Sequence, residues 1–158
     1  MKKIIPNIKV PIIKNGITTI TSLKDEFNNK KSILFGLPGA FTPTCSDMHL
    51  PDFIKSINLF EKHGIFNIYC LSVNDQYVMK SWLLSHSNSE KIIGIADGNA
   101  EITKFFNLLT DKTKNYMGFR SARFSMIIDN NIIKNIFIEK PGEYEVSSPI
   151  SILSHINE

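Results

Sequence analysis

The strongest chemical signal in the sequence is Cys45, which ends the segment PGAFTPTC at positions 38–45. Thr42 and Pro43 are typical of the N-cap and the first position of a helix, so the thiol is expected in the first helical turn. Unpaired backbone N–H groups and the positive end of the helix dipole gather there and favour a thiolate. Because the thiolate is the nucleophilic form of cysteine, the segment predicts a reactive thiol.

A helix end alone does not ionise a thiol near neutral pH. It supplies about 0.3–1 kcal/mol, whereas a shift of roughly two to three pKa units, at about 1.4 kcal/mol each, is required. A guanidinium is the natural second contributor, since it stays charged and donates several hydrogen bonds. The chain has only two arginines, Arg120 and Arg123. The hydroxyl of Thr42, three residues before the thiol, is a further candidate partner for the sulfur.

The composition is that of an ordinary globular protein. The 158 residues are 42% hydrophobic and 21% charged, enough for one domain over 1–158 with its own core. Two cysteines, Cys45 and Cys70, cannot form the disulfide framework of a small secreted scaffold, and no Cys/His spacing typical of a metal site occurs. The net charge is only +3 and the lysines are scattered, so no nucleic-acid partner is expected.

No membrane segment is expected either, because no apolar run approaches about 18 residues. The N-terminal stretch MKKIIPNIKVPIIK has Pro6, Lys9 and Pro11 within its apolar part, which argues against a signal peptide. We therefore expect the protein in the cytoplasm, or in an organelle such as a mitochondrion or plastid if a targeting segment upstream is removed.

The elements that must position Cys45 alternate between strand and helix patterns, which predicts an α/β fold with a central mixed sheet flanked by helices. Asn15-Gly16 predicts a hairpin turn, and Asp129-Asn130-Asn131 between two apolar, β-branched runs suggests a second hairpin. Strands are expected at 8–20 (as a hairpin), 32–37, 65–73, 91–96, 123–129 and 131–138, and helices at 22–27, 42–63, 74–86, 100–109 and from 149. Cys45 then follows the carboxyl end of a central strand, where ligand crevices form in open α/β sheets.

The segment PGAFTPTCS at 38–46 matches the active-site pattern of the peroxiredoxins, which is Pro, three residues, Thr, two residues and Cys. It resembles the peroxiredoxin-5 subfamily most, and HLP at 49–51, CLSVND at 70–75 and RFSM at 123–126 also resemble that subfamily. The resemblance implies a thioredoxin-like fold. It further implies a thiol-dependent peroxidase that reduces hydrogen peroxide and organic hydroperoxides through a cysteine sulfenic acid, in antioxidant defence and redox homeostasis.

The resemblance also assigns roles to residues. Cys45 matches the peroxidatic cysteine, and Thr42 matches the threonine that hydrogen-bonds the thiolate and the peroxide. Pro38 matches the proline that shields the cysteine, and Arg123 the arginine that favours the thiolate and polarises the peroxide. Arg120 is then a surface or supporting residue. No cofactor and no metal are implied.

The sequence departs from animal members of the subfamily, which carry a resolving cysteine near the C-terminus. The matching position here is Ser147, which cannot form a disulfide. Cys70 lies in the predicted strand 65–73, so we expect it in the core. The resemblance therefore implies a one-cysteine cycle reduced from outside, by glutathione with glutaredoxin or, second, by thioredoxin. It also suggests a homodimer.

Three questions stay open at this level. A redox relay that passes oxidation from Cys45 to partner proteins would use the same residues as a peroxidase, whereas a holdase chaperone is disfavoured by the short C-terminus. His49 follows Cys45 by one helical turn, but the resemblance implies a structural role rather than acyl-transfer chemistry. Phe41 and Phe119 can line a substrate pocket, a dimer seam or neither.

Overall fold

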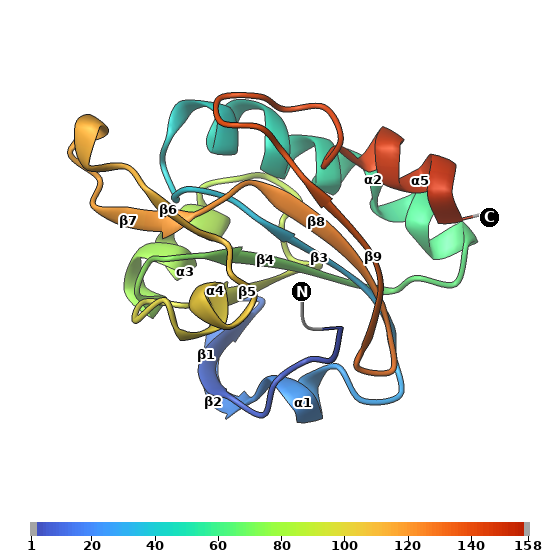
Figure 1. Ribbon diagram of the computed structural model, residues 1–158. Coiled ribbons are helices and arrows are strands. Elements are labelled where there is room, and N and C mark those ends of the chain that lie inside the picture. Colours follow the sequence, from blue (N-terminus) through green and yellow to red (C-terminus); the bar gives the residue numbers. More distant parts are fainter. Residues whose placement is uncertain (1–2, 157–158) are drawn as a thin grey trace.

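A seven-stranded sheet forms the centre of the protein in the computed structural model, which describes residues 3–156 (Figure 1). The strand order is β2-β1-β5-β4-β3-β8-β9, in which β3, β4 and β5 are parallel and the remaining neighbours pair antiparallel. The strands are β1 (Lys9–Lys14), β2 (Ile17–Ser22), β3 (Lys31–Gly36), β4 (Asn67–Ser72), β5 (Ile92–Ala96), β8 (Phe124–Asp129) and β9 (Ile132–Ile138). The predicted α/β fold with a mixed sheet is confirmed.

Helices cover both faces of this sheet. Figure 1 shows α2 (Leu50–Lys62) and α5 (Pro149–Ile156) together on one side, and α1 (Leu23–Glu26) on the other. Along β3 the side chains alternate, because successive residues of a strand point to opposite faces. Ile33 and Phe35 join the core cluster that contains Cys45, Phe53 from α2 and Trp82 from α3 (Gln76–Leu84).

The opposite face has its own core. Leu34 of β3 packs in a second cluster with Leu23 of α1 and Ile102 of α4 (Glu101–Phe105). Because both faces are buried, the central strands are continuously apolar, as the sequence indicates.

Both predicted hairpins are confirmed, and their turns show why. Asn15 and Gly16 have φ of 48° and 77° between β1 and β2, and Asn130 and Asn131 have φ of 46° and 67° between β8 and β9. Asparagine and glycine tolerate this left-handed region better than other residues do, so these turns form at little cost.

Four features differ from the expected elements. The helix predicted over 42–63 contains a π-helical turn at Cys45–His49, closed by a hydrogen bond from the Leu50 N–H to the Cys45 carbonyl. Helices α3 and α4 end earlier than predicted, at Leu84 and Phe105. The fourth feature is an unpredicted two-stranded hairpin, β6 (Leu109–Asp111) with β7 (Phe119–Ser121), joined through a 3₁₀ turn at Thr113–Asn115.

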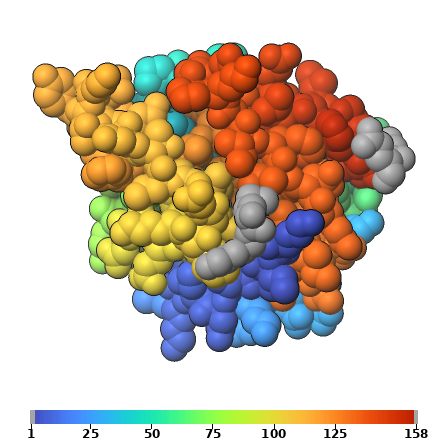
Figure 2. All heavy atoms as spheres, in the orientation of Figure 1, coloured from blue at the N-terminus to red at the C-terminus, as the bar shows by residue number. Residues whose placement is uncertain are grey.

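The β6–β7 hairpin projects from the body of the molecule (Figure 1), and the space-filling view shows the same projection (Figure 2). Strands of three residues are too short to show an alternating pattern, so they could not be predicted from the sequence. Within residues 3–156 no helix is long and apolar enough to cross a membrane.

Candidate active site

The loop after β3 carries Cys45 into the interior at the carboxyl end of the strand. Hydrogen bonds from two of its residues help to hold this loop: the Ala40 N–H donates to Asn74 Oδ1 at 3.0 Å, and Thr42 Oγ1 donates to the Gly39 carbonyl at 2.6 Å. Thr42 stands at the predicted N-cap position just before Pro43, with its hydroxyl turned back to the loop. The Cys45 side chain has no exposed surface.

The π-helical turn is fixed on one side by α3. Leu50 donates to Cys45 rather than to Ser46, and Pro51 has no N–H to offer, so the Ser46 carbonyl lacks a backbone donor. His86 Nε2 donates to this carbonyl at 2.9 Å, and Trp82 Nε1 donates to Ser46 Oγ at 2.9 Å. We call Ser46, Trp82 and His86 the α3 clamp.

Arg123 reaches the sulfur from the opposite side of the turn. It directly precedes β8, whose antiparallel register with β3 sets Phe124 opposite Gly36. A Cβ on Gly36 would come within 2.0 Å of the Phe124 ring, so only glycine permits this close pairing. Arg123 Nη2 donates to Cys45 Sγ at 3.3 Å, and Nη1 lies 2.9 Å from His49 Nδ1.

The second arginine braces the loop instead. Arg120 Nε donates to the Met117 carbonyl at 2.8 Å, and its Nη1 donates to the Pro38 carbonyl at 3.4 Å. These contacts tie the β6–β7 hairpin to the loop before Cys45, so Arg120 is a supporting residue.

His49 is fully buried between Arg123 and Ser147. Its Nε2 lies 3.3 Å from the Ser147 carbonyl. Burial, together with the nearby Arg123 charge, lowers the pKa of His49 to about 3, so the imidazole is neutral at physiological pH. The structural role expected for His49 agrees with these contacts. The contact between His49 and Arg123 was not predicted; its one sign in the sequence is that His49 follows Cys45 by one helical turn.

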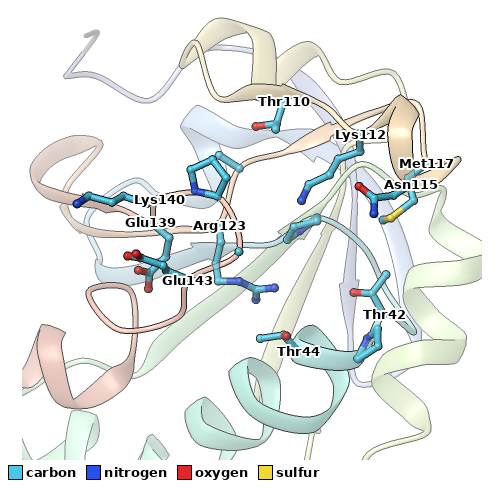
Figure 3. A pocket seen from close by; sticks show the side chains of 15 residues that line it. Thr42, Thr44, Thr110, Lys112, Asn115, Met117, Arg123, Glu139, Lys140 and Glu143 are labelled. Atoms are coloured by element: carbon cyan, nitrogen blue, oxygen red, sulfur yellow. The ribbon is translucent and has the colours of Figure 1, made fainter.

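A cavity of about 270 Å³ opens over Arg123 (Figure 3). Its floor includes Pro38 and Thr42, so three of the four predicted site residues line one space while the fourth, Cys45, lies buried behind Arg123. Lys112 points into the cavity from the β6–β7 hairpin (Figure 3). The full lining is Pro38, Thr42, Pro43, Thr44, Thr110, Lys112, Asn115, Met117, Ala122, Arg123 and residues 139–143.

Within residues 3–156, no three His, Cys, Asp or Glu side chains are grouped so that they could hold a metal ion. What the arrangement can do is nucleophilic sulfur chemistry. A guanidinium that donates to sulfur stabilises the thiolate, and fixed donors also stabilise the negative charge that moves onto a leaving oxygen.

Comparison with known proteins agrees with this chemistry. The redoxin family profile matches residues 2–150. Peroxiredoxin-2D of Arabidopsis thaliana is 43% identical over 124 residues, which cover 78% of this chain and 76% of that protein.

Two solved structures superpose closely. Reduced Prx3 of Vibrio vulnificus in complex with hydrogen peroxide has a TM-score of 0.92 at 36% identity and covers 99% of this chain and 96% of that one. The antioxidant protein of Plasmodium falciparum, a 1-Cys peroxiredoxin, has a TM-score of 0.91 at 37% identity, with 99% of each chain covered.

Fold and site therefore define a thiol-based peroxidase on a thioredoxin-like scaffold. The chain belongs to the peroxiredoxin family, and the resemblance expected from the PGAFTPTCS segment is confirmed. It is a thiol-dependent peroxidase for hydrogen peroxide and organic hydroperoxides, a function that needs no prosthetic cofactor.

Proposed function

We propose that Cys45 is the peroxidatic nucleophile and that Arg123, Thr42 and Pro38 form its catalytic surroundings. The observation that carries this proposal is the 3.3 Å contact from Arg123 Nη2 to Cys45 Sγ. Arg123 holds the sulfur as a thiolate and binds the peroxide oxygens. Thr42 supplies a hydroxyl at the cavity floor, and Pro38 keeps bulk water from the sulfur.

In the first step the thiolate attacks the terminal oxygen of the peroxide. A sulfur–oxygen bond forms as the oxygen–oxygen bond breaks, and the departing alkoxide or hydroxide takes a proton from solvent. Cys45 becomes a sulfenic acid, oxidised by two electrons, while the peroxide is reduced to an alcohol or water. Arg123 stabilises the charge on the leaving oxygen because its donors are already in place.

The sulfenic acid is reduced by a thiol from outside the chain. Ser147 occupies the place where a resolving cysteine is expected, and Cys70 is fully buried. Burial, with the neighbouring Cys45 charge, raises the pKa of the Cys70 thiol well above its usual value, so Cys70 is a poor nucleophile. An external thiol then condenses with the sulfenic acid and releases water, and a second thiol cleaves the mixed disulfide.

Glutathione, with glutaredoxin for the second thiol exchange, is the proposed reductant, ahead of thioredoxin. Glutathione carries two carboxylates, and the cavity offers them cationic partners. Lys112 points into this space beside Arg123 (Figure 3), and the Lys112 ammonium makes no ion pair with any carboxylate of residues 3–156. The Glu139 and Glu143 carboxylates lie on the other side of the cavity.

Mass spectrometry of peroxide-treated protein tests the cycle. With glutathione present, the expected product carries glutathione on Cys45; a Cys45–Cys70 disulfide would contradict the one-cysteine cycle. Turnover with glutathione, its carboxyl esters and dithiothreitol then tests the reductant. Lys112→Met should raise KM for glutathione severalfold but leave dithiothreitol unaffected, and Lys114→Met, in the same turn but outside the cavity, is the matched control.

The wider proposal places residues 1–158 in one domain that assembles as a homodimer. Phe41 and Phe119, each more than half exposed beside the active-site loop, are the apolar residues offered to a second copy. Gel filtration with light scattering tests the dimer, and a monomer at micromolar concentration would contradict it. The compartment must hold glutathione, which the cytosol and organelles such as mitochondria and plastids do.

A further inference from the structure

Ser147 is tied into the protein through every polar atom it has. Its N–H and its hydroxyl donate to Glu139 Oε2 at 2.9 and 2.7 Å. Its carbonyl accepts from Ser125 Oγ at 2.6 Å and faces His49 Nε2 at 3.3 Å. The residue at the expected resolving position is therefore a fully buried junction between the C-terminal segment and the active site.

Glu139 is the anchor of this junction. Besides the two bonds from Ser147, its Oε2 accepts the N–H of Glu145 at 2.6 Å. Burial by itself raises the pKa of Glu139, but the hydrogen bonds from Ser147 and Glu145 outweigh burial and lower the pKa below its usual value. Glu139 Oε2 thus accepts all three hydrogen bonds from Glu145 and Ser147. These bonds fix the backbone of segment 139–147 and so the direction of the Ser147 carbonyl.

That carbonyl decides which ring nitrogen of His49 carries the proton. A carbonyl oxygen can only accept a hydrogen bond, and a guanidinium can only donate. His49 Nε2 faces the Ser147 carbonyl and Nδ1 faces Arg123 Nη1, so the proton must be on Nε2 and the lone pair on Nδ1. With the proton on Nδ1, two donors would oppose each other at 2.9 Å.

The His49 lone pair in turn aims Arg123. A guanidinium is planar, so fixing Nη1 on His49 and Nη2 on the sulfur sets its plane. Tyr144, from the same segment, has its ring 4.8 Å from the His49 ring and 5.9 Å from Arg123 Cζ, and its hydroxyl donates to Asp52 Oδ2 at 2.6 Å. Segment 139–147 therefore contacts His49 through Ser147 and Tyr144, and Arg123 through the Tyr144 ring.

We infer that Glu139 and Ser147 are positioning residues of the peroxidase: through the Ser147 carbonyl they hold His49 in its Nε2–H tautomer, so that Arg123 is aimed at Cys45. We call Glu139, Ser147, His49 and Arg123 the arginine relay. The inference rests on the proposed role of Cys45. It gives the residue that replaces a resolving cysteine a task in the oxidation step rather than in reduction.

Glu139→Gln is the decisive variant, because glutamine keeps the size but replaces one acceptor oxygen by an amide that can only donate. We expect the rate constant for reaction with hydrogen peroxide to fall about tenfold. We also expect the Cys45 thiolate, followed by its ultraviolet absorbance, to form at higher pH than in the parent protein. Loss of a negative charge alone would favour the thiolate, so the direction of this shift separates positioning from simple electrostatics.

Glu145→Gln is the matched control, since it removes the same charge from an exposed side chain of the same segment. It should leave both the peroxide rate and the thiolate titration unchanged. A folded Glu139→Gln protein with parental rate and titration would overturn the inference, and so would equal effects of the two variants.

Nitrogen NMR of the His49 ring gives a test that needs no variant. The two tautomers have distinct ring-nitrogen shifts, and the parent protein should show the proton on Nε2. A proton on Nδ1 would overturn the inference even if Glu139→Gln failed to fold. Because this readout does not depend on turnover, it is separate from the proposed peroxidase role, which would fail if Cys45→Ser kept its activity.

Discussion

The π-helical turn at Cys45–His49 is held from two sides that differ in kind. The α3 clamp binds Ser46 with one indole N–H from α3 and one imidazole N–H from His86, two residues after the end of that helix. The arginine relay reaches the other end of the turn through His49, and its other members precede β8, follow β9 and lie in the C-terminal segment. Only the relay brings a charged group to the sulfur.

The difference separates two tasks that an activated thiol requires. The α3 clamp fixes where the turn lies through two hydrogen bonds to Ser46, each worth about 0.5–1.5 kcal/mol. In the proposed mechanism the arginine relay favours the thiolate, because a positive charge within hydrogen-bond distance stabilises the ionised form of a thiol. We therefore expect the clamp to govern stability and the relay to govern reactivity.

Removal of the sulfur nucleophile has the largest expected effect. Cys45→Ser should abolish peroxide consumption, because the serine hydroxyl does not ionise near neutral pH and forms no sulfenic acid. Cys70→Ala is the paired control and should keep nearly all glutathione-dependent turnover. Loss of most activity in Cys70→Ala, at unchanged circular dichroism, would mean that Cys70 takes part in the catalytic cycle.

Arg123→Met tests the member of the arginine relay that contacts the sulfur. We expect the rate constant with hydrogen peroxide to fall about 10²–10³-fold, as when a fixed donor to a developing charge is removed. Stopped-flow measurement of peroxide reduction, with intact folding checked by circular dichroism, gives the value. Arg120→Met, which removes a loop brace, should cost far less; a larger loss than in Arg123→Met would reverse the two assignments.

His49 makes stability depend on pH. Its pKa is about 3 in the folded protein against 6.5 for a histidine side chain exposed to water, so between these values the unfolded chain binds a proton that the native state does not. Stability therefore falls on acidification, by about 1.5 kcal/mol from roughly pH 6.5 to pH 5.

Urea unfolding across this pH range, compared with His49→Gln, isolates the contribution of His49. Glutamine keeps one acceptor and one donor but does not titrate, so the acid-induced loss should shrink in the variant. An identical pH dependence in both proteins would mean that His49 is not held neutral.

The α3 clamp gives the smallest effect. A double-mutant cycle of Ser46→Ala and Trp82→Phe should show a coupling free energy of about 1 kcal/mol in urea unfolding. The peroxide rate constant of Ser46→Ala should stay within about threefold of the parent, since a supporting hydrogen bond away from the sulfur is lost. A fall in the peroxide rate constant as large as that of Arg123→Met would mean that the α3 clamp also governs reactivity.

Most of the fold could be predicted because its signals are local. Asn15-Gly16, the apolar run at 32–37 and Pro149 each specify a turn, a strand or a helix start from their own chemistry. The π-helical turn and the β6–β7 hairpin could not be predicted. The first depends on Pro51 and a distant His86 that together satisfy Ser46, and the second consists of strands too short to show a pattern.

The sequence alone was enough to identify Cys45 as the proposed nucleophile, because the proline–threonine–cysteine spacing typical of the peroxiredoxins lies within one short segment. It also placed Arg123 beside the sulfur through resemblance, and the structure puts Nη2 3.3 Å from it. How that arginine is held could be seen only in the folded protein. Glu139 follows β9, Ser147 lies in the C-terminal segment and His49 precedes α2, so their donors and acceptors, far apart in the sequence, meet only through folding.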